Sequence, residues 1–167
     1  MRKASVIVVT MLLLAGCSMD GEAPASGGGP QGGETARVVQ VIDGDTIDVN
    51  LNGEQVRVRY VGVNTPERDQ SCYSEARAAN SSMVSGQNVT LLRDTSDTDQ
   101  YGRLLRYVYV GDTFVNEQLV RDGWAELVVY QPDDQYADDF RTLEQQAARA
   151  GLGCHPSGIF DDGSYTR

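Results

Sequence analysis

Four charged residues stand at positions where the local sequence does not require a charge. They are Asp45, Arg59, Glu67 and Arg103. A carboxylate can hold a cation or activate a water molecule, and guanidinium groups bind phosphate oxygens in a bidentate manner. Together these groups would suit the cleavage of a phosphodiester bond, which needs positive charge near the phosphorus and an activated water. Singly, each has a simpler explanation as a turn residue, a solvated strand residue or an acid near a helix N-terminus.

Short motifs around these residues are far more specific in their order and spacing. The motifs are Asp43-Gly44-Asp45-Thr46, the run from Arg59 to Glu67, Asp99-Gln100-Tyr101-Gly102-Arg103, and Val115-Asn116-Glu117 with Leu119-Val120 and Gly123. In this order they resemble the motif series of the staphylococcal nuclease family, over about residues 36–152. The resemblance implies a Ca²⁺-dependent endonuclease that cleaves DNA and RNA, prefers single strands and leaves 3′-phosphate ends.

The resemblance also implies a calcium site made of oxygen ligands. Asp45 would be the principal ligand, Asn64 would support the ion, and Thr65 would offer its backbone carbonyl. The best-known members of the family carry Asp where this sequence has Asn64. An amide oxygen still binds calcium but brings no charge, so we expect a lower calcium affinity than an aspartate would give.

The remaining site residues follow from the same resemblance. Arg59 and Arg103 would bind the phosphate, and Glu67 would act as the general base or orient the water. Tyr101 and Tyr130 would stack on bases, with packing at the rim of the site as the alternative for both. A second strand arginine, Arg57, ranks behind Arg59 because the spacing to Glu67 selects Arg59.

Two other functional classes compete with the enzyme. The chain could be a non-catalytic nucleic-acid-binding module of the same fold, or a calcium-stabilised structural lipoprotein of the surface. The presence of Arg59, Glu67 and Arg103 together favours the enzyme.

Hydrophobic patterning predicts an α+β fold with five strands and three helices. The strands are expected at 37–42, 46–51, 55–63, 88–93 and 104–110, with Asn52-Gly53 as a hairpin turn. The helices are expected at 74–85, 115–122 and 136–150. Three strands, a helix, two strands and further helices suit a five-stranded OB-type β-barrel, an assignment that rests partly on the resemblance.

The first residues have the pattern of an export signal. Residues 1–16 combine Arg2 and Lys3 with a short apolar run and small residues, as in a signal peptide. Leu14-Ala15-Gly16-Cys17 resembles a bacterial lipobox, which predicts lipidation of Cys17, although an ordinary signal peptide remains the alternative. Residues 17–35 are then a flexible tether, 36–155 the nuclease-like domain and 156–167 a loose polar tail.

Export and a lipid anchor at the cell envelope would affect how the two remaining cysteines and the net charge of the protein are interpreted. Cys72 and Cys154 remain as a pair, and an oxidising compartment favours a disulfide between them. His155 is expected to be an ordinary surface residue. Without Arg2 and Lys3, 12 basic and 24 acidic residues remain, all the basic ones being Arg. Such acidity argues against a general DNA-coating protein and would suit high salt. We expect a monomer.

Overall fold

A closed barrel of five strands forms the body of the computed structural model, which describes residues 30–161. The strands are β1 Glu34–Val41, β2 Thr46–Leu51, β3 Glu54–Tyr60, β5 Asn88–Leu92 and β6 Leu104–Val110. They are hydrogen-bonded in the order β3-β2-β1-β5-β6, and a parallel pairing of β3 with β6 closes the ring. The other barrel pairings are antiparallel. The predicted five-stranded OB-type barrel with three helices is confirmed.

The hairpin of β2 and β3 has the register that its alternating pattern predicts. Ile47 lies opposite Val58 and Val49 opposite Val56, so one face of both strands is apolar. Ile47, Val49 and Val58 are fully buried in the barrel. The turn at Asn52 and Gly53 has positive φ angles at both residues, as the Asn-Gly signal requires.

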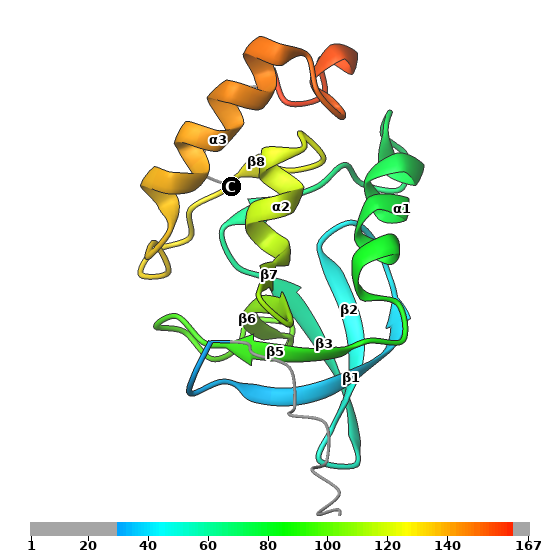
Figure 1. Ribbon diagram of the computed structural model, residues 1–167, viewed down its shortest axis with the longest axis vertical. Coiled ribbons are helices and arrows are strands. Elements are labelled where there is room, and N and C mark those ends of the chain that lie inside the picture. The colour runs from blue at the N-terminus through cyan, green and yellow to red at the C-terminus, as the bar shows by residue number, and fades with distance from the viewer. Residues whose placement is uncertain (1–29, 162–167) are drawn as a thin grey trace, which may run out of the picture.

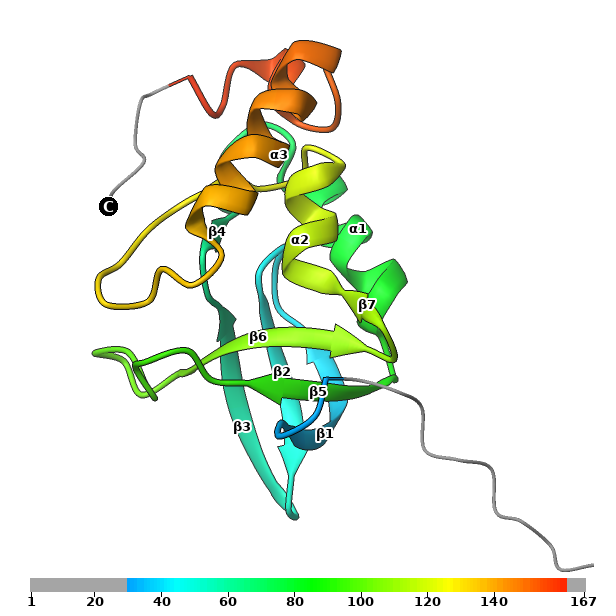
Figure 2. The same ribbon diagram turned by 60° about the vertical axis from the view of Figure 1, so that its left-hand side comes forward.

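Three helices cover one end of the barrel, with α2 between α1 and α3 (Figures 1 and 2). They are α1 Tyr73–Val84, α2 Val115–Arg121 and α3 Ala137–Ala150. In α3, Phe140 and Ala147 lie on one buried stripe, and Gly151 ends the helix in the left-handed conformation. No helix within residues 30–161 has the length and hydropathy needed to cross a membrane.

Three local expectations were wrong. The third strand does not run to residue 63: β3 ends at Tyr60, Gly62 turns the chain with φ +79°, and Val63–Asn64 forms a separate strand, β4. β1 begins at Glu34 rather than at residue 37, because residues 34–37 pair with β5. Within the expected loose tail, η1 (His155–Ser157) is ordered and Phe160 contacts the His155 ring.

β4 pairs with β8 (Glu126–Leu127) in a small second sheet, and β7 (Thr113–Phe114) pairs with the end of β6. A disulfide joins Cys72, just before α1, to Cys154, just before η1. Residues 1–29 and 162–167 lie outside the described residues, so the signal segment, the lipidation of Cys17 and most of the tether stay predictions.

Candidate active site

The turn between β1 and β2 directs the Asp45 carboxylate into the protein. The Asp43 carboxylate accepts a hydrogen bond from the Asp45 amide at 3.1 Å, which shapes the turn. A Cβ at Gly44 would lie 2.7 Å from the Thr65 side chain, so only glycine lets the turn approach so closely. Asp45 is consequently only 5% exposed.

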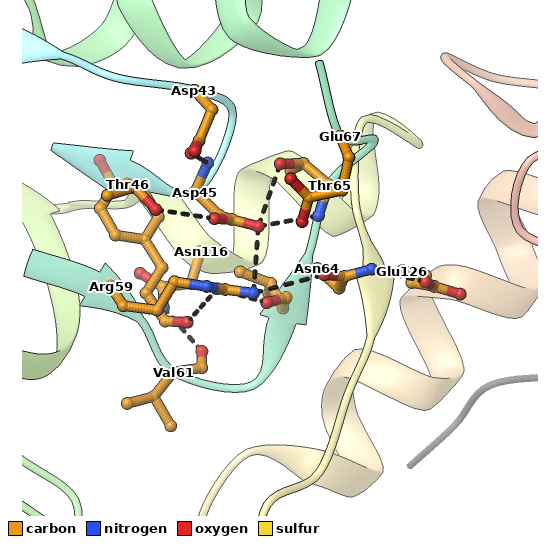
Figure 3. Close-up of polar contacts among 12 residues, drawn as sticks. Asp43, Asp45, Thr46, Arg59, Val61, Asn64, Thr65, Glu67, Asn116 and Glu126 are labelled. Carbon is orange, nitrogen blue, oxygen red and sulfur yellow. Dashed lines mark hydrogen bonds and ion pairs between the residues drawn. The ribbon is translucent and has the colours of Figure 1, made fainter. Parts of the chain in front are cut away.

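Asp45 joins the turn to two other segments (Figure 3). Its Oδ2 accepts hydrogen bonds from the Thr65 amide at 2.8 Å and the Thr65 hydroxyl at 3.0 Å. The same oxygen lies 3.2 Å from Nη2 of Arg59, in an ion pair. Hydrogen bonds and an adjacent cation satisfy this buried charge, as a desolvated carboxylate requires.

Arg59 is held in one orientation by the backbone that follows it. Its Nη1 donates to the carbonyls of Tyr60 and Val63, both at 2.7 Å. These two bonds need the turn at Gly62, which brings the Val63 carbonyl back toward the strand end. Arg57, by contrast, pairs with Asp48 at 2.7 Å on the outside of the barrel and is half-exposed. The structure therefore separates the two strand arginines.

Asn64 is held by a residue that sequence reasoning missed. Its Nδ2 donates to Oε1 of Glu126 at 2.8 Å, and its Oδ1 accepts a long 3.4 Å contact from Arg59. Glu126 is only 4% exposed. The sequence did contain a signal for this contact. Glu126 is an acid inside the apolar run 125–129, where burial of a carboxylate without a partner would be unfavourable.

An open cleft of about 580 Å³ brings most of the expected residues together. Arg103 on its wall pairs with Asp99 at 2.6 Å and stacks over the Tyr101 ring at 5.6 Å. Tyr101 is 76% exposed and Tyr130 51% exposed, so both rings are accessible. The expected residues on the cleft wall are Arg59, Asn64, Glu67, Tyr101, Arg103 and Tyr130. Asp45 and Thr65 are buried behind that wall.

Burial and neighbouring groups shift the pKa values of two carboxyl groups in opposite directions. Burial, reinforced by the charge of Asp45, raises the pKa of Asp43 to about 6. Burial also acts to raise the pKa of Asp99, but hydrogen bonds from Arg103 outweigh it and hold that pKa below its usual value. Asp99 therefore stays ionised as the partner of Arg103.

The ligands expected for calcium are all oxygen atoms, which is the donor type that a hard cation prefers. The Asp45 carboxylate and the Asn64 Oδ1 both lie against Nη2 of Arg59, so they face the same point. Within residues 30–161 there is no group of three His, Cys, Asp or Glu side chains that could hold a metal ion. The donors fit a hard cation, held by one carboxylate and by neutral oxygens.

Comparison with known proteins shows the family of this chain. The staphylococcal nuclease homologue family model matches residues 57–154. The chain is 35% identical over 122 residues to a thermonuclease of Staphylococcus hyicus, covering 70% of this chain and 72% of that protein. It is 37% identical over 123 residues to a thermonuclease of Staphylococcus intermedius, covering 70% and 71%. It is 44% identical over 116 residues to endonuclease YncB of Bacillus subtilis, covering 65% of this chain and 55% of that one. The chain therefore belongs to the staphylococcal nuclease family and is a nuclease.

Proposed function

We propose that this nuclease is a calcium-dependent phosphodiesterase that cleaves DNA and RNA internally, prefers single strands and leaves 3′-phosphate ends. The observation that carries the proposal is the cleft wall, where two arginines and a carboxylate, Arg59, Arg103 and Glu67, surround one space. The oxygen donors behind Arg59 support the calcium requirement. Relatives named thermonuclease and endonuclease support the substrate class.

Each of the three residues has a role that its position permits. Arg59 is fixed by backbone carbonyls and presents its guanidinium to a phosphate without further ordering, which is what electrostatic stabilisation of a transition state requires. Arg103 binds the other side of the phosphate and donates a hydrogen bond toward the leaving 5′-oxygen. Glu67 is exposed to the cleft and takes or orients the proton of the attacking water. Calcium, when bound, supplies positive charge beside the phosphoryl oxygens.

The preference for single strands is supported by the aromatic side chains of the cleft. Exposed aromatic rings stack on unpaired bases, with about 1–3 kcal/mol per base. Tyr101 and Tyr130 line the same cleft as the two arginines and are both exposed by half or more. A base next to the bound phosphate could therefore stack on either ring, which a base inside a duplex cannot do.

The full-length protein, incubated with end-labelled single-stranded DNA, tests the proposal. We expect cleavage with calcium and none with excess EGTA, and 3′-phosphate groups on the products. Glu67→Gln and Arg59→Ala should each lower kcat by at least about 10²-fold, as for other general bases and charge-stabilising groups. Arg121→Ala is the control, since this half-exposed arginine pairs with Glu117 on the surface of α2, and it should change kcat by less than about threefold.

Two outcomes would contradict the proposal. A fall of less than tenfold for both Glu67→Gln and Arg59→Ala would place the chemistry elsewhere. A folded protein that binds oligonucleotides but does not cleave them under any calcium or salt condition would be a non-catalytic binding module.

We also propose that the protein is exported and held at the cell envelope by a lipid on Cys17. The support is the signal-like pattern of residues 1–16 and the Leu-Ala-Gly-Cys junction. Metabolic labelling with a radioactive fatty acid should mark the wild-type chain and not Cys17→Ser. Equal labelling of the two, or none in either, would reject the anchor.

A further inference from the structure

A buried acid lies directly behind the cleft wall, and the chemistry proposed above assigns it no role. Glu126 belongs to β8, which pairs antiparallel with β4, and its register partner in that pairing is Asn64. Glu126 is 4% exposed. Asn64 lines the cleft and is an expected calcium ligand. The two side chains, 62 positions apart in the sequence, meet at 2.8 Å.

We propose that Glu126 is a positioning residue for the metal site: its carboxylate holds the Asn64 amide nitrogen, so that Oδ1 faces Asp45 and Arg59. We further infer that Glu126 makes an amide, and not a carboxylate, the compatible group at position 64. That calcium is the ligand rests on the proposed function. The orientation of Asn64 rests only on its hydrogen bond to Glu126.

An amide has one end that donates and one end that accepts, so its partners decide which end faces the cation. In this contact Glu126 Oε1 is the acceptor, and it therefore takes the Nδ2 end of Asn64. The Oδ1 end is then directed to Nη2 of Arg59 at 3.4 Å, the nitrogen that also pairs with Asp45 at 3.2 Å. Without Glu126, rotation about the last side-chain bond could present the amide nitrogen, which repels a cation.

A carboxylate behind a ligand also changes the ligand's strength. A hydrogen bond to an anion is shorter and stronger than a neutral one, and outer partners of metal ligands raise ligand basicity as well as fixing orientation. Loss of such a partner commonly reduces metal affinity by about 10–100-fold. Glu126 would in this way partly restore the electron density that a neutral amide lacks as a calcium ligand.

The same contact predicts an unfavourable result for the substitution that should otherwise strengthen calcium binding. In Asn64→Asp, a second carboxylate would face the buried Glu126 where the hydrogen bond now lies, and repulsion between the two groups would replace that hydrogen bond. Adding Glu126→Gln to that variant restores a donor. The double variant has the same pair of groups as the wild type, with amide and carboxylate exchanged between the two strands.

The first measurement is the stability of four full-length proteins without calcium: wild type, Asn64→Asp, Glu126→Gln and the double variant. We expect Asn64→Asp to lower the folding equilibrium constant at least tenfold, and the double variant to recover most of that loss. Such coupling, measured by urea unfolding, does not require the protein to bind calcium or cleave nucleic acid. Additive effects of the two substitutions, or a fully stable Asn64→Asp, would overturn the inference.

The second measurement is the dissociation constant for calcium, obtained by isothermal titration calorimetry. Glu126→Leu should weaken binding about 10–100-fold. Glu144→Leu is the matched control, because Glu144 is also a buried acid near Glu126 but its hydrogen bond is to the Leu127 backbone, and it should change affinity less than about threefold. An equal loss in both would mean that only buried charge matters and would overturn the positioning role. Failure of the wild type to bind calcium would reject the proposed function, whereas the stability cycle would still decide the orientation of Asn64.

Discussion

The disulfide between Cys72 and Cys154 should supply a large part of the stability of this domain. It closes a loop of 82 positions that contains α1, β5, β6, α2 and α3. In the chain-entropy model, a link across a loop of this length destabilises the unfolded chain by about 4.5 kcal/mol at 25 °C. Whole domains are stable by only about 5–15 kcal/mol, so this link decides whether the fold persists on heating.

The perturbation is the double substitution Cys72→Ala/Cys154→Ala, with alanine chosen because Cys154 is buried and a serine hydroxyl there would need a partner. We expect a loss of about 3–5 kcal/mol in the free energy of unfolding, measured by urea denaturation. The slope with urea should rise, since the unfolded chain expands without the link. Reduction of the wild-type protein with dithiothreitol reaches the same state without substitution and serves as the control.

Activity provides a second measurement on the same variant. The disulfide lies at the end of the segment that carries Glu67, but that residue also has its own hydrogen bonds with Gln70, at 2.7 and 2.8 Å. At a temperature where both proteins are folded, kcat should therefore fall by less than about tenfold. A stability loss below about 1 kcal/mol would refute the entropic reasoning, and a hundredfold loss of kcat would show that the disulfide positions the carboxylate.

Three further predictions follow from single side chains. Tyr101→Ala should weaken the binding of a single-stranded oligonucleotide in EGTA by about 5–150-fold, and Tyr101→Phe should not, as fluorescence anisotropy would show; equal losses would exclude stacking. Burial, with the charge of Glu126, raises the pKa of Glu144 to about 7, so its contribution to stability is present below about pH 4.5 and lost as the pH rises through 7. Glu144→Gln should thus stabilise the protein by about 1–2 kcal/mol at pH 8 and not at pH 4.5, in urea titrations; an equal effect at both would exclude the ionisation. Asn116→Ala leaves two buried backbone groups without their hydrogen bonds and should cost about 2–4 kcal/mol in thermal unfolding; a loss under 1 kcal/mol would contradict this.

The barrel was predictable because its information is local. Alternating residues of β2 and β3 define the buried face, and Asn52-Gly53 fixes the turn that sets their register. The early end of β3 was not predictable in this way. A Cβ at Gly62 would lie 2.9 Å from the Phe140 ring, 78 positions away, so the turn depends on a tertiary contact with α3. The pattern of residues 55–63 carries no trace of that contact.

In the site, too, the residue types were predictable from the sequence, whereas their arrangement was not. The motifs identify Asp45, Arg59 and Glu67, since their chemistry is visible in the sequence. The hydrogen bond between Glu126 and Asn64 depends on a sheet of two-residue strands from distant segments, too short for any periodic pattern. Pairing of this kind can only be read from the folded chain, although a lone acid in an apolar run indicates that some partner must exist.

The pairing of charges in the cleft explains how a strongly acidic protein can bind a polyanion. Both cleft arginines are neutralised by a neighbouring carboxylate, Arg59 by Asp45 and Arg103 by Asp99. If calcium binds as proposed, it would compete with Arg59 for the Asp45 carboxylate, and the guanidinium of Arg59 would then be available to a phosphate. Each ligand would then remove a competitor of the other, so calcium and the phosphate would raise each other's affinity by the same factor. The cleft would therefore not need a positive field that reaches far into solution, because calcium binding would make the charge of Arg59 available to the substrate.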